Sequence, residues 1–263
     1  MTIIRPKKSL GQHFLKDLGI AARIAETLSV YRGLPVLEVG PGTGVLTSFL
    51  LQDGHDLSVV EIDRLSVTYL KEHFPALDGR IHVDDFLQMS LNQLYPSKFC
   101  VIGNYPYYIS SQIFFKVLDY RDQVVCCSGM IQKEVAERLA AKPGTRSFGI
   151  LSALIQPWYD VEYLFTVSEE VFEPPPKVKS AVVRMTRNGR TDLGCDESLY
   201  KQVVKTAFNQ RRKTLRNSMK PLLGKDCQSL ELPLFDKRPE QLSIEQFTEL
   251  TLITSNYLKT KQL

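Results

Sequence analysis

The sequence predicts an α/β fold: a mostly parallel, doubly wound sheet with an antiparallel hairpin at one edge, followed by a small C-terminal all-α domain. Three observations lead to this prediction. Short apolar runs alternate with helical patterns from residue 36 to residue 141. Two β-rich runs then follow each other without a clear helix between them, and the apolar patterns of the last quarter are helical. Strands that alternate with helices form parallel sheets with right-handed crossovers.

The first half of the chain supplies the parallel strands and their helices. Apolar runs ending near glycines or polar residues predict strands over 36–39, 57–61, 80–83, 99–102 and 123–127. The intervening patterns predict helices over 45–51, 64–74, 111–118 and 133–141. The β-rich runs at 161–165 and 181–185 are expected to pair as the antiparallel edge hairpin.

A polar, turn-rich segment marks the boundary between two expected domains. Residues 188–194 read Asn-Gly-Arg-Thr-Asp-Leu-Gly, which is typical of a linker. We therefore expect a catalytic domain over residues 1–187 and a helical domain over residues 188–263. Within the second, apolar spacing predicts helices over 199–207, 214–223 and 244–257.

Composition excludes several classes of protein. Of 263 residues 43% are hydrophobic and 24% are charged, which rules out a wholly disordered chain. No apolar stretch approaches the ~18 residues of a membrane span, and the first residues lack the apolar core of a secretion signal. The five cysteines form no C-x-x-C pair, so neither a disulfide framework nor a zinc site is indicated. A reducing, cytoplasmic setting is expected.

Positive charge is concentrated in two segments. The net charge is +4, and seven basic residues with no acidic residue lie between Lys201 and Lys220. A second patch free of acids spans residues 1–16 and includes Lys7 and Lys8. Such clusters attract phosphate backbones; a solvated helix face is the alternative interpretation.

A glycine-rich loop follows the first predicted strand. Gly40, Gly42 and Gly44 alternate with other residues between that strand and a helix. Glycine lets a backbone turn tightly and lets a ligand approach the main chain. Glu61 ends the second strand, where an acid accepts hydrogen bonds from ribose hydroxyls. Asp85 follows the third strand, where it can accept one from an adenine amine. Together they predict a nucleoside-cofactor site, rather than a structural turn beside two surface acids.

The spacing within this loop selects among nucleoside cofactors. The third glycine of a dinucleotide G-x-G-x-x-G fingerprint is missing, because Val45 and Leu46 follow Gly44, and no Walker lysine is present. The pattern E-x-G-x-G-x-G instead resembles the S-adenosylmethionine loop of class I methyltransferases.

The fourth strand runs into the sequence Asn104-Tyr105-Pro106-Tyr107. An adenine amine is a poor nucleophile because its lone pair is delocalised into the ring. The side-chain oxygen of Asn104 and a nearby backbone carbonyl can accept hydrogen bonds from that amine, which localises the lone pair. Pro106 stiffens the turn and Tyr107 offers a stacking face for the base. Neither a strong base nor a metal is required, since catalysis comes from positioning and preorganised dipoles.

With these motifs the chain resembles, over nearly its whole length, the KsgA-type small-subunit rRNA adenine N6,N6-dimethyltransferases. The segment from Lys8 to Leu15 is similar to the family's opening segment, which closes over the methionine end of the cofactor. Residues 132–138 resemble a segment after the fifth strand. The family's F-x-P-x-P-K-V-x-S motif matches residues 172–180, and its helical-domain signature resembles residues 208–217.

This resemblance implies a set of site residues. The cofactor is S-adenosylmethionine, in contact with Gln12, His13, Leu15, Gly40, Gly42, Gly44, Glu61, Asp85 and Asn104. The catalytic set is Asn104, Tyr105, Pro106, Tyr107 and Phe172, with Phe172 sandwiching the flipped adenine against Tyr107. RNA contacts are expected from Arg211, Arg212, Lys213, Arg216, Lys7 and Lys8. The fold is the class I methyltransferase sheet of seven strands.

Two positions depart from the family pattern. His13 stands where the family usually has Asn, and Tyr105 stands where Leu or Ile is common. Because the backbone carbonyl of residue 105 is the acceptor, its side chain is expected to matter little.

The implied activity is dimethylation of two adjacent adenosines near the 3′ end of small-subunit rRNA, within a pre-ribosomal small subunit. A monomer with no obligate protein partner is expected. The alternatives are a large-subunit rRNA methyltransferase of the macrolide-resistance type, a ribosome-assembly factor for which methylation is secondary, and a small-molecule methyltransferase.

Overall fold

The protein consists of two compact units, seen in a computed structural model that describes residues 12–261. Within the described part, residues 12–136 and 160–187 form the first unit, and residues 137–159 and 188–261 form the second. The segment 137–159 thus groups with the C-terminal helices, although it lies in the middle of the chain. The expected sites Lys7 and Lys8 lie outside the described residues.

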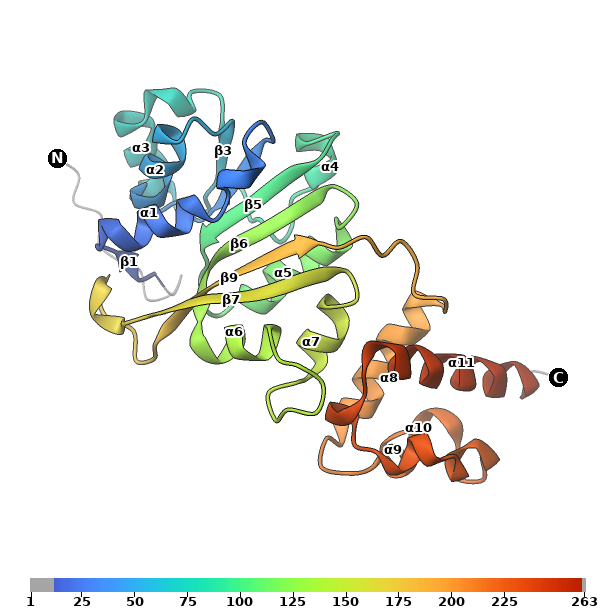
Figure 1. Ribbon diagram of the computed structural model, residues 1–263. Coiled ribbons are helices and arrows are strands. Elements are labelled where there is room, and N and C mark those ends of the chain that lie inside the picture. Colours follow the sequence, from blue (N-terminus) through green and yellow to red (C-terminus); the bar gives the residue numbers. More distant parts are fainter. Residues whose placement is uncertain (1–11, 262–263) are drawn as a thin grey trace. The chain divides into compact units, whose positions relative to one another are not determined.

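A seven-stranded sheet forms the centre of the first unit (Figure 1). Its strands in spatial order are β4 (Ile81–His82), β3 (Leu57–Val60), β2 (Val36–Val39), β5 (Phe99–Asn104), β6 (Val124–Gln132), β9 (Ser180–Arg187) and β7 (Tyr159–Val167). The pairs from β4 to β6 are parallel, and β9 pairs antiparallel with β6. The expected sheet and its late antiparallel edge are confirmed.

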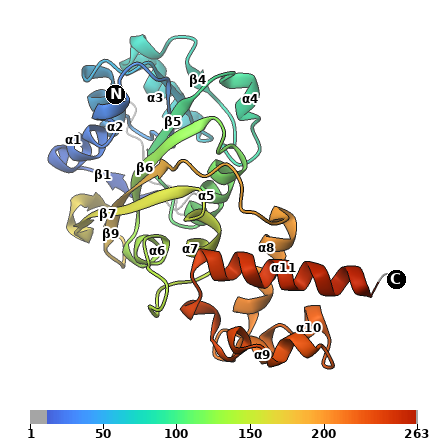
Figure 2. The same ribbon diagram turned by 45° about the vertical axis from the view of Figure 1, so that its right-hand side comes forward.

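Helices cover both sides of this sheet (Figures 1 and 2). They are α1 (Leu18–Glu26), α2 (Val45–Gln52), α3 (Arg64–His73), α4 (Leu91–Leu94), α5 (Ser110–Asp119) and α6 (Lys133–Leu139). Aspartates cap two of them: Asp17 accepts a hydrogen bond from the Ile20 N–H, and Asp63 accepts one from the Leu65 N–H. A carboxylate there satisfies amide groups that have no partner inside the helix.

A second, two-stranded sheet joins distant parts of the first unit. Strand β1 (Phe14–Leu15) pairs antiparallel with β8 (Phe172–Glu173), so that Leu15 lies opposite Phe172. Both of these side chains are buried in the same hydrophobic cluster as Ile24 of α1 and Val182 of β9. The pairing therefore fixes the opening segment against the F-x-P-x-P segment.

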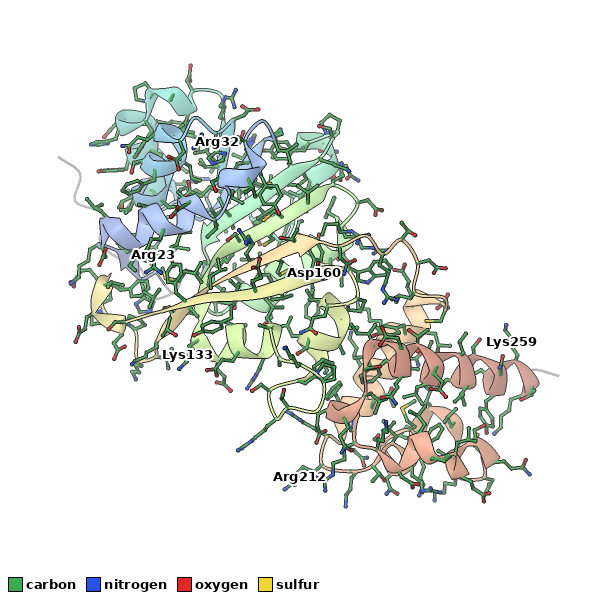
Figure 3. All side chains as sticks on the ribbon, viewed as in Figure 1. Arg23, Arg32, Lys133, Asp160, Arg212 and Lys259 are labelled. Carbon is green, nitrogen blue, oxygen red and sulfur yellow. The ribbon has the colours of Figure 1, made fainter. Side chains whose placement is uncertain are left out.

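The second unit is built from helices around an aromatic core. Its helices are α7 (Ile150–Ile155), α8 (Glu197–Asn209), α9 (Leu215–Ser218), α10 (Lys220–Leu223) and α11 (Ile244–Thr260). Phe208 and Phe247 stack with ring centroids 5.9 Å apart, and Tyr200 meets Phe247 edge-on at 6.3 Å. The buried Tyr200 hydroxyl donates to the carbonyl of Ala153 at 3.0 Å, which ties α8 to α7. Arg212 lies in the turn after α8 (Figure 3).

One expected helix is wrong. The pattern over 214–223 predicts a single helix, but the structure has α9 and α10, each of four residues, with a break at Met219. The reason is Pro221, which has no N–H and whose ring would clash with a carbonyl one turn back. Proline is accepted in the first turn of a helix, and it occupies that position in α10.

Several short 3₁₀ turns complete the chain. They span Ser29–Tyr31, Pro75–Leu77, Glu169–Val171, Gln228–Glu231, Pro233–Asp236 and Pro239–Gln241. None of the helices in the described part is long and apolar enough to cross a membrane.

Candidate active site

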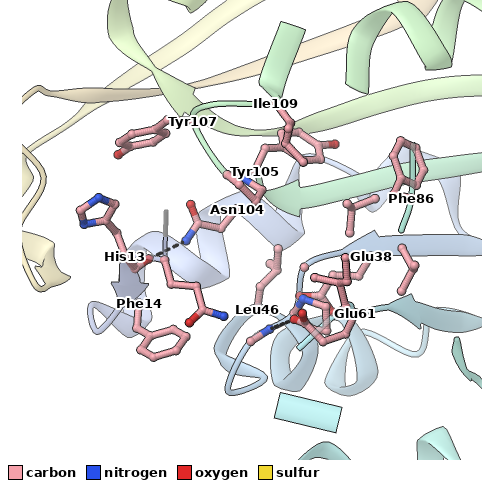
Figure 4. A pocket seen from close by; sticks show the side chains of 18 of the residues that line it. His13, Phe14, Glu38, Leu46, Glu61, Phe86, Asn104, Tyr105, Tyr107 and Ile109 are labelled. Carbon is pink, nitrogen blue, oxygen red and sulfur yellow. Dashed lines mark hydrogen bonds between the residues drawn. The ribbon is translucent and has the colours of Figure 1, made fainter. Parts of the chain in front are cut away.

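A cavity opens at the carboxyl ends of β2, β3 and β5 (Figure 4). Ligands of open α/β sheets bind at this edge, where strand order reverses. The lining comes from residues 12–15, 38–43, 45–46, 60–62, 84–87 and 104–109. The glycine loop, both expected cofactor acids and the Asn-Tyr-Pro-Tyr turn thus meet in one place, although they are far apart in the sequence.

The glycine loop adopts a backbone conformation that residues other than glycine rarely adopt. Gly40, Gly42 and Gly44 have φ angles of 68°, 56° and 78°, in the left-handed region. A Cβ atom at Gly44 would lie only 2.3 Å from the ring of Phe74. A side chain at position 44 is therefore excluded by packing as well as by the backbone conformation. The turn also exposes its main chain to the cavity.

Glu61 holds this loop against the next strand. Its Oε2 accepts the Gly42 N–H at 3.1 Å and its Oε1 accepts the Asp63 N–H at 2.8 Å. Burial raises the pKa of the carboxyl, and these backbone hydrogen bonds oppose that shift. Each oxygen has a further lone pair, so the carboxylate can hold the loop and still accept ribose hydroxyls.

Glu38 lies beneath the loop and is also buried. The Thr47 hydroxyl donates to its Oε2 at 2.6 Å. Complete burial raises the pKa of Glu38 to about 8, so this carboxyl is mostly protonated at neutral pH. A neutral acid here avoids repulsion with Glu61, whose negative charge also raises the pKa of Glu38.

Asp85 follows β4 and lines the cavity. Its Oδ1 accepts the Leu87 N–H at 2.9 Å. Lys116 of α5 supports the same loop: its ammonium donates to the carbonyl of Leu87 at 3.1 Å and to that of Met89. Sequence reasoning missed Lys116, because a lysine in a helix gives no sign that it reaches back to a loop.

Asn104 ends β5 with its amide aimed into the cavity. Its Nδ2 donates to the backbone carbonyl of His13 at 3.3 Å. A carbonyl only accepts, so this bond identifies the nitrogen and leaves the amide oxygen on the opposite side. That oxygen points toward Tyr107 (Figure 4).

The side chain of Tyr105 matters more than the sequence indicated. It is 1% exposed, and its hydroxyl donates to the Ser128 carbonyl at 2.7 Å. A Cβ at Gly129 would lie 2.6 Å from this ring, and one at Gly103 would lie 2.9 Å away. The glycines of β5 and β6 therefore leave room for Tyr105, and they are the sequence signal that could have identified its packing.

Tyr107 is a fixed aromatic platform at the cavity. Its hydroxyl and the Ser180 hydroxyl lie 2.5 Å apart in a hydrogen bond. Burial raises the pKa of Tyr107, so the phenol stays neutral. Pro106 and Ile109 line the cavity on either side of it in the sequence.

Phe172 is not placed with these groups. It is 1% exposed within the hydrophobic cluster and does not line the cavity. In this conformation it offers no ring face to a base beside Tyr107.

The opening segment closes one side of the cavity. Gln12, His13, Phe14 and Leu15 line it, and Gln12 Nε2 lies 3.5 Å from an Asp63 oxygen. A Cβ at Gly42 would lie 3.1 Å from Phe14, so the Phe14 ring packs on the glycine loop. The expected cofactor contacts of this segment, Gln12, His13 and Leu15, therefore line the same cavity as the glycine loop.

Four of the expected RNA-binding residues lie in the second unit, namely Arg211, Arg212, Lys213 and Arg216. Arg211 donates to the carbonyl of Arg146, while Arg216 pairs with Asp236 through Nε at 3.2 Å. Lys213 lines a groove that sequence reasoning missed, shared with Gln210, Asn217, Lys220, Pro221, Gly224 and Lys225. Spacing along the sequence did not show that Lys220 and Lys225 converge on it.

The described residues contain no cluster of His, Cys, Asp and Glu suited to a metal. The cysteines of β5 and β6 are buried, and desolvation raises the pKa values of Cys100 and Cys127 to about 12. These thiols are therefore unreactive core groups.

Comparison with known proteins identifies the family. The sequence model of the family described as "Ribosomal RNA adenine dimethylase" matches residues 3–254. The chain belongs to this family.

Curated relatives of this adenine dimethylase are closely similar. A "Ribosomal RNA small subunit methyltransferase A" of Parabacteroides distasonis is 71% identical over 259 residues, covering 98% of this chain and 97% of the relative. The protein of the same name from Bacteroides thetaiotaomicron is 63% identical over 261 residues, covering 99% and 98%.

Solved structures share the fold of this adenine dimethylase. A dimethyladenosine transferase from Plasmodium falciparum has a TM-score of 0.78 at 25% identity, covering 93% of this chain and 98% of its own. The 23S rRNA methyltransferase ErmE has a TM-score of 0.71 at 25% identity, covering 92% and 99%. The chain is therefore a methyltransferase by fold and an adenine dimethylase by family.

Proposed function

We propose that this protein transfers methyl groups from S-adenosylmethionine to the N6 atoms of two adjacent adenosines near the 3′ end of small-subunit rRNA. The observation that carries the proposal is the amide of Asn104. Its oxygen faces a cavity shared with the glycine loop and Glu61. The site therefore has an acceptor for an amine beside a pocket suited to a nucleoside cofactor.

The residues of the cavity fit S-adenosylmethionine. Glu61 has lone pairs for the ribose hydroxyls. Asp85 accepts the Leu87 N–H with Oδ1, which leaves its other carboxylate oxygen for the adenine amine of the cofactor. Gly40 and Gly42 present main chain where a side chain would intrude. Gln12 and Leu15 line the side assigned to the methionine end. When bound, the cofactor supplies an activated methyl group on a sulfonium.

The chain's contribution to the chemistry is to position and polarise the amine. The Asn104 side-chain oxygen and the Tyr105 backbone carbonyl accept its two N–H groups, which concentrates the lone pair on nitrogen. The acceptors are fixed before substrate arrives, because Asn104 is held by the His13 carbonyl and Tyr105 by its buried ring. With the cofactor bound, the amine nitrogen would form the new bond to the methyl carbon as the bond from that carbon to sulfur breaks, which leaves a neutral thioether, and the nitrogen would lose one proton to solvent.

The second unit is proposed to hold the RNA. Arg211, Arg212, Lys213 and Arg216 lie on it, together with the groove of Lys220 and Lys225. Phosphate contacts of this kind give affinity and register without reading sequence.

Sequence identity favours the small-subunit substrate over the large-subunit one. The two solved structures named above have the same identity to this chain, 25%, although one is named a dimethyladenosine transferase and the other a 23S rRNA methyltransferase. The fold therefore does not separate the substrates. The relatives that are 71% and 63% identical carry the small-subunit name.

The test is methyl transfer to immature small ribosomal subunits. We expect labelled S-adenosylmethionine to place up to four methyl groups per subunit, and primer extension to stop at two neighbouring adenosines. Label in large-subunit rRNA instead, or macrolide resistance in cells that make the protein, would favour the second candidate. An Asn104→Ala variant that matures subunits normally without labelling them would support the assembly-factor reading.

A further inference from the structure

Tyr105 is attached to strand β6 at two points. Its backbone N–H donates to the carbonyl of Met130 at 3.0 Å. Its phenol hydroxyl donates to the carbonyl of Ser128, on the same strand, at 2.7 Å. Burial raises the pKa of this phenol well above its usual value, so the hydroxyl stays protonated and remains a donor. Main chain and side chain of the residue are therefore both held by β6.

Two glycines leave the space that the ring occupies. A Cβ atom at Gly129 would lie 2.6 Å from the Tyr105 ring and would clash with the Gly103 carbonyl oxygen. The φ angle of Gly129 is 151°, which residues other than glycine rarely adopt. Phe114 of α5 meets the Tyr105 ring edge-on, with centroids 6.0 Å apart. A smaller side chain at position 105 would leave part of this space empty and would not reach the Ser128 carbonyl.

The proline that follows restricts the direction of the Tyr105 carbonyl. Steric contact with the Pro106 ring keeps the preceding residue extended, which limits rotation about its Cα–C bond. The carbonyl of Pro106 in turn accepts the Ile109 N–H at 3.2 Å, which closes the turn. Within the described residues, no hydrogen bond is made to the Tyr105 carbonyl oxygen. That oxygen is therefore fixed in direction, and its lone pairs are available to a substrate.

The attachment through the hydroxyl is a departure from the family pattern, in which Leu or Ile is common at this position. Those side chains have no hydrogen-bond donor, so they provide no such attachment. A displacement of a reacting group by about 1 Å can lower a rate about 100-fold. A second attachment of the residue that carries an acceptor should therefore affect turnover, and not only stability.

We propose that the Tyr105 hydroxyl, by its bond to the Ser128 carbonyl, positions the backbone carbonyl of residue 105 for the target amine. Tyr105 is thus a positioning residue through its side chain, in addition to carrying an acceptor on its main chain. The inference rests on the proposed adenine methylation and deepens it. It also gives a functional reason for the glycine at position 129, because the ring requires the space beside it.

The test compares Tyr105→Phe and Tyr105→Leu with wild type in methyl transfer to immature small subunits, well below the melting temperature of the least stable variant. Loss of the hydroxyl should lower kcat about 3- to 10-fold, and loss of the ring about 100-fold. KM for the subunits and Kd for S-adenosylmethionine should each stay within about twofold of wild type, because the lost interaction acts in the transition state. Rescue of most of the Leu defect by Phe separates the ring from the hydroxyl.

The matched control is Tyr200→Phe. Tyr200 is a buried tyrosine of the second unit whose hydroxyl also donates to a backbone carbonyl, that of Ala153 at 3.0 Å. Its removal breaks a similar bond, but Tyr200 does not line the cavity. We expect kcat in Tyr200→Phe to stay near wild type, even where its melting temperature falls as far as that of Tyr105→Phe.

A second measurement needs no methyl transfer. Hydrogen exchange of the backbone amides from residue 104 to residue 109 reports how firmly the turn is held. Exchange of the amide at residue 105, which donates to Met130, should be several-fold faster in Tyr105→Phe than in wild type. In Tyr200→Phe it should be unchanged.

Four results would overturn the inference. They are a kcat for Tyr105→Leu within about threefold of wild type, a defect confined to KM, equal losses of kcat in Tyr200→Phe and Tyr105→Phe, and unchanged amide exchange at residue 105 in Tyr105→Phe. If wild-type protein itself labels no RNA, the proposed function fails, while hydrogen exchange still shows whether the hydroxyl holds the turn. The two failures are thereby distinguished.

Discussion

The orientation of the Asn104 amide is the most demanding feature at the scale of single residues. Its nitrogen donates to the His13 carbonyl, and the proposed function assigns the amide oxygen to the target amine. Replacement by Asp keeps the shape but puts a carboxylate oxygen against that carbonyl. We expect Asn104→Asp to lower kcat at least about 100-fold, measured with saturating donor and subunits. Asn92→Asp, on an exposed position of α4, is the control; equal losses in both variants would contradict the assignment.

Tyr105 gives a prediction about stability. Tyr105→Phe leaves the Ser128 carbonyl without its buried hydroxyl donor, at a cost of about 1 kcal/mol. Tyr105→Leu also removes ring atoms that pack on Gly103 and Gly129, and should lower the free energy of unfolding by about 2–4 kcal/mol. Urea unfolding measures both. A Leu variant as stable as wild type would show that the ring is dispensable.

Glu38 gives a prediction about pH. Its pKa rises from 4.5 to about 8 on burial, so between these values the folded state binds more protons than the unfolded state. The free energy of unfolding should therefore fall as pH rises through this window. Glu38→Gln removes the titrating group and should flatten the decline. Urea unfolding from pH 5 to pH 9 measures it; parallel profiles for the two proteins would refute the buried neutral acid.

At the scale of elements, the loop that carries Asp85 depends on a helix behind it. Lys116 of α5 donates to two carbonyls of this loop, at Leu87 and Met89. Lys116→Met removes both bonds while it keeps the length of the side chain. We expect the Kd for S-adenosylmethionine to rise about 10-fold, with kcat at saturating donor largely retained.

Isothermal titration calorimetry with S-adenosylmethionine measures this Kd. The control is Lys98→Met, at an exposed position. An unchanged affinity in Lys116→Met would show that the loop holds its shape without the lysine.

Elements with strong local patterns were predictable from the sequence. The strands β2, β3, β5 and β6 are buried apolar runs, and their order in the chain predicts the parallel part of the sheet. Helices α8 and α11 follow clear apolar spacing. These features were confirmed because each depends on neighbours within a few residues.

Features that depend on distant partners were not predictable. Strands β1 and β8 have two residues each. This length is too short for the alternation of apolar and polar residues to be recognised in the sequence. The burial of Phe172 against Leu15 accompanies that pairing. The motif at Asn104 located the site, but the side chains that support it, Lys116 and Tyr105, became visible only in three dimensions.

At the scale of the whole molecule, the proposed function assigns the chemistry to the first unit and RNA affinity to the second. The cavity belongs to the first unit, and the basic groove belongs to the second. Substitutions in the groove should therefore change how binding responds to salt, while substitutions in the cavity should change the rate at saturating RNA.

Neutralising Arg211 and Arg212 together tests this division. Each phosphate contact contributes a little under one to the slope of log K against log salt, so Arg211→Gln with Arg212→Gln should lower that slope by about 1–2. Filter binding to small-subunit RNA at several salt concentrations measures it. Lys71→Gln with Lys98→Gln, on exposed positions of the first unit, should leave the slope as in wild type. Equal slopes in both double variants would contradict the RNA-binding role.

The pairing of β1 with β8 also has a consequence for biosynthesis. During translation the N-terminal side of the pocket emerges early, yet its partner strand at Phe172 and strand β9, which reaches Arg187 and lies between β6 and β7, are made much later. A nascent chain arrested near residue 150 would contain the glycine loop and Asn104 but would lack strands β8 and β9. Donor-binding capacity should accordingly mature only after the segment through Arg187 has left the exit tunnel.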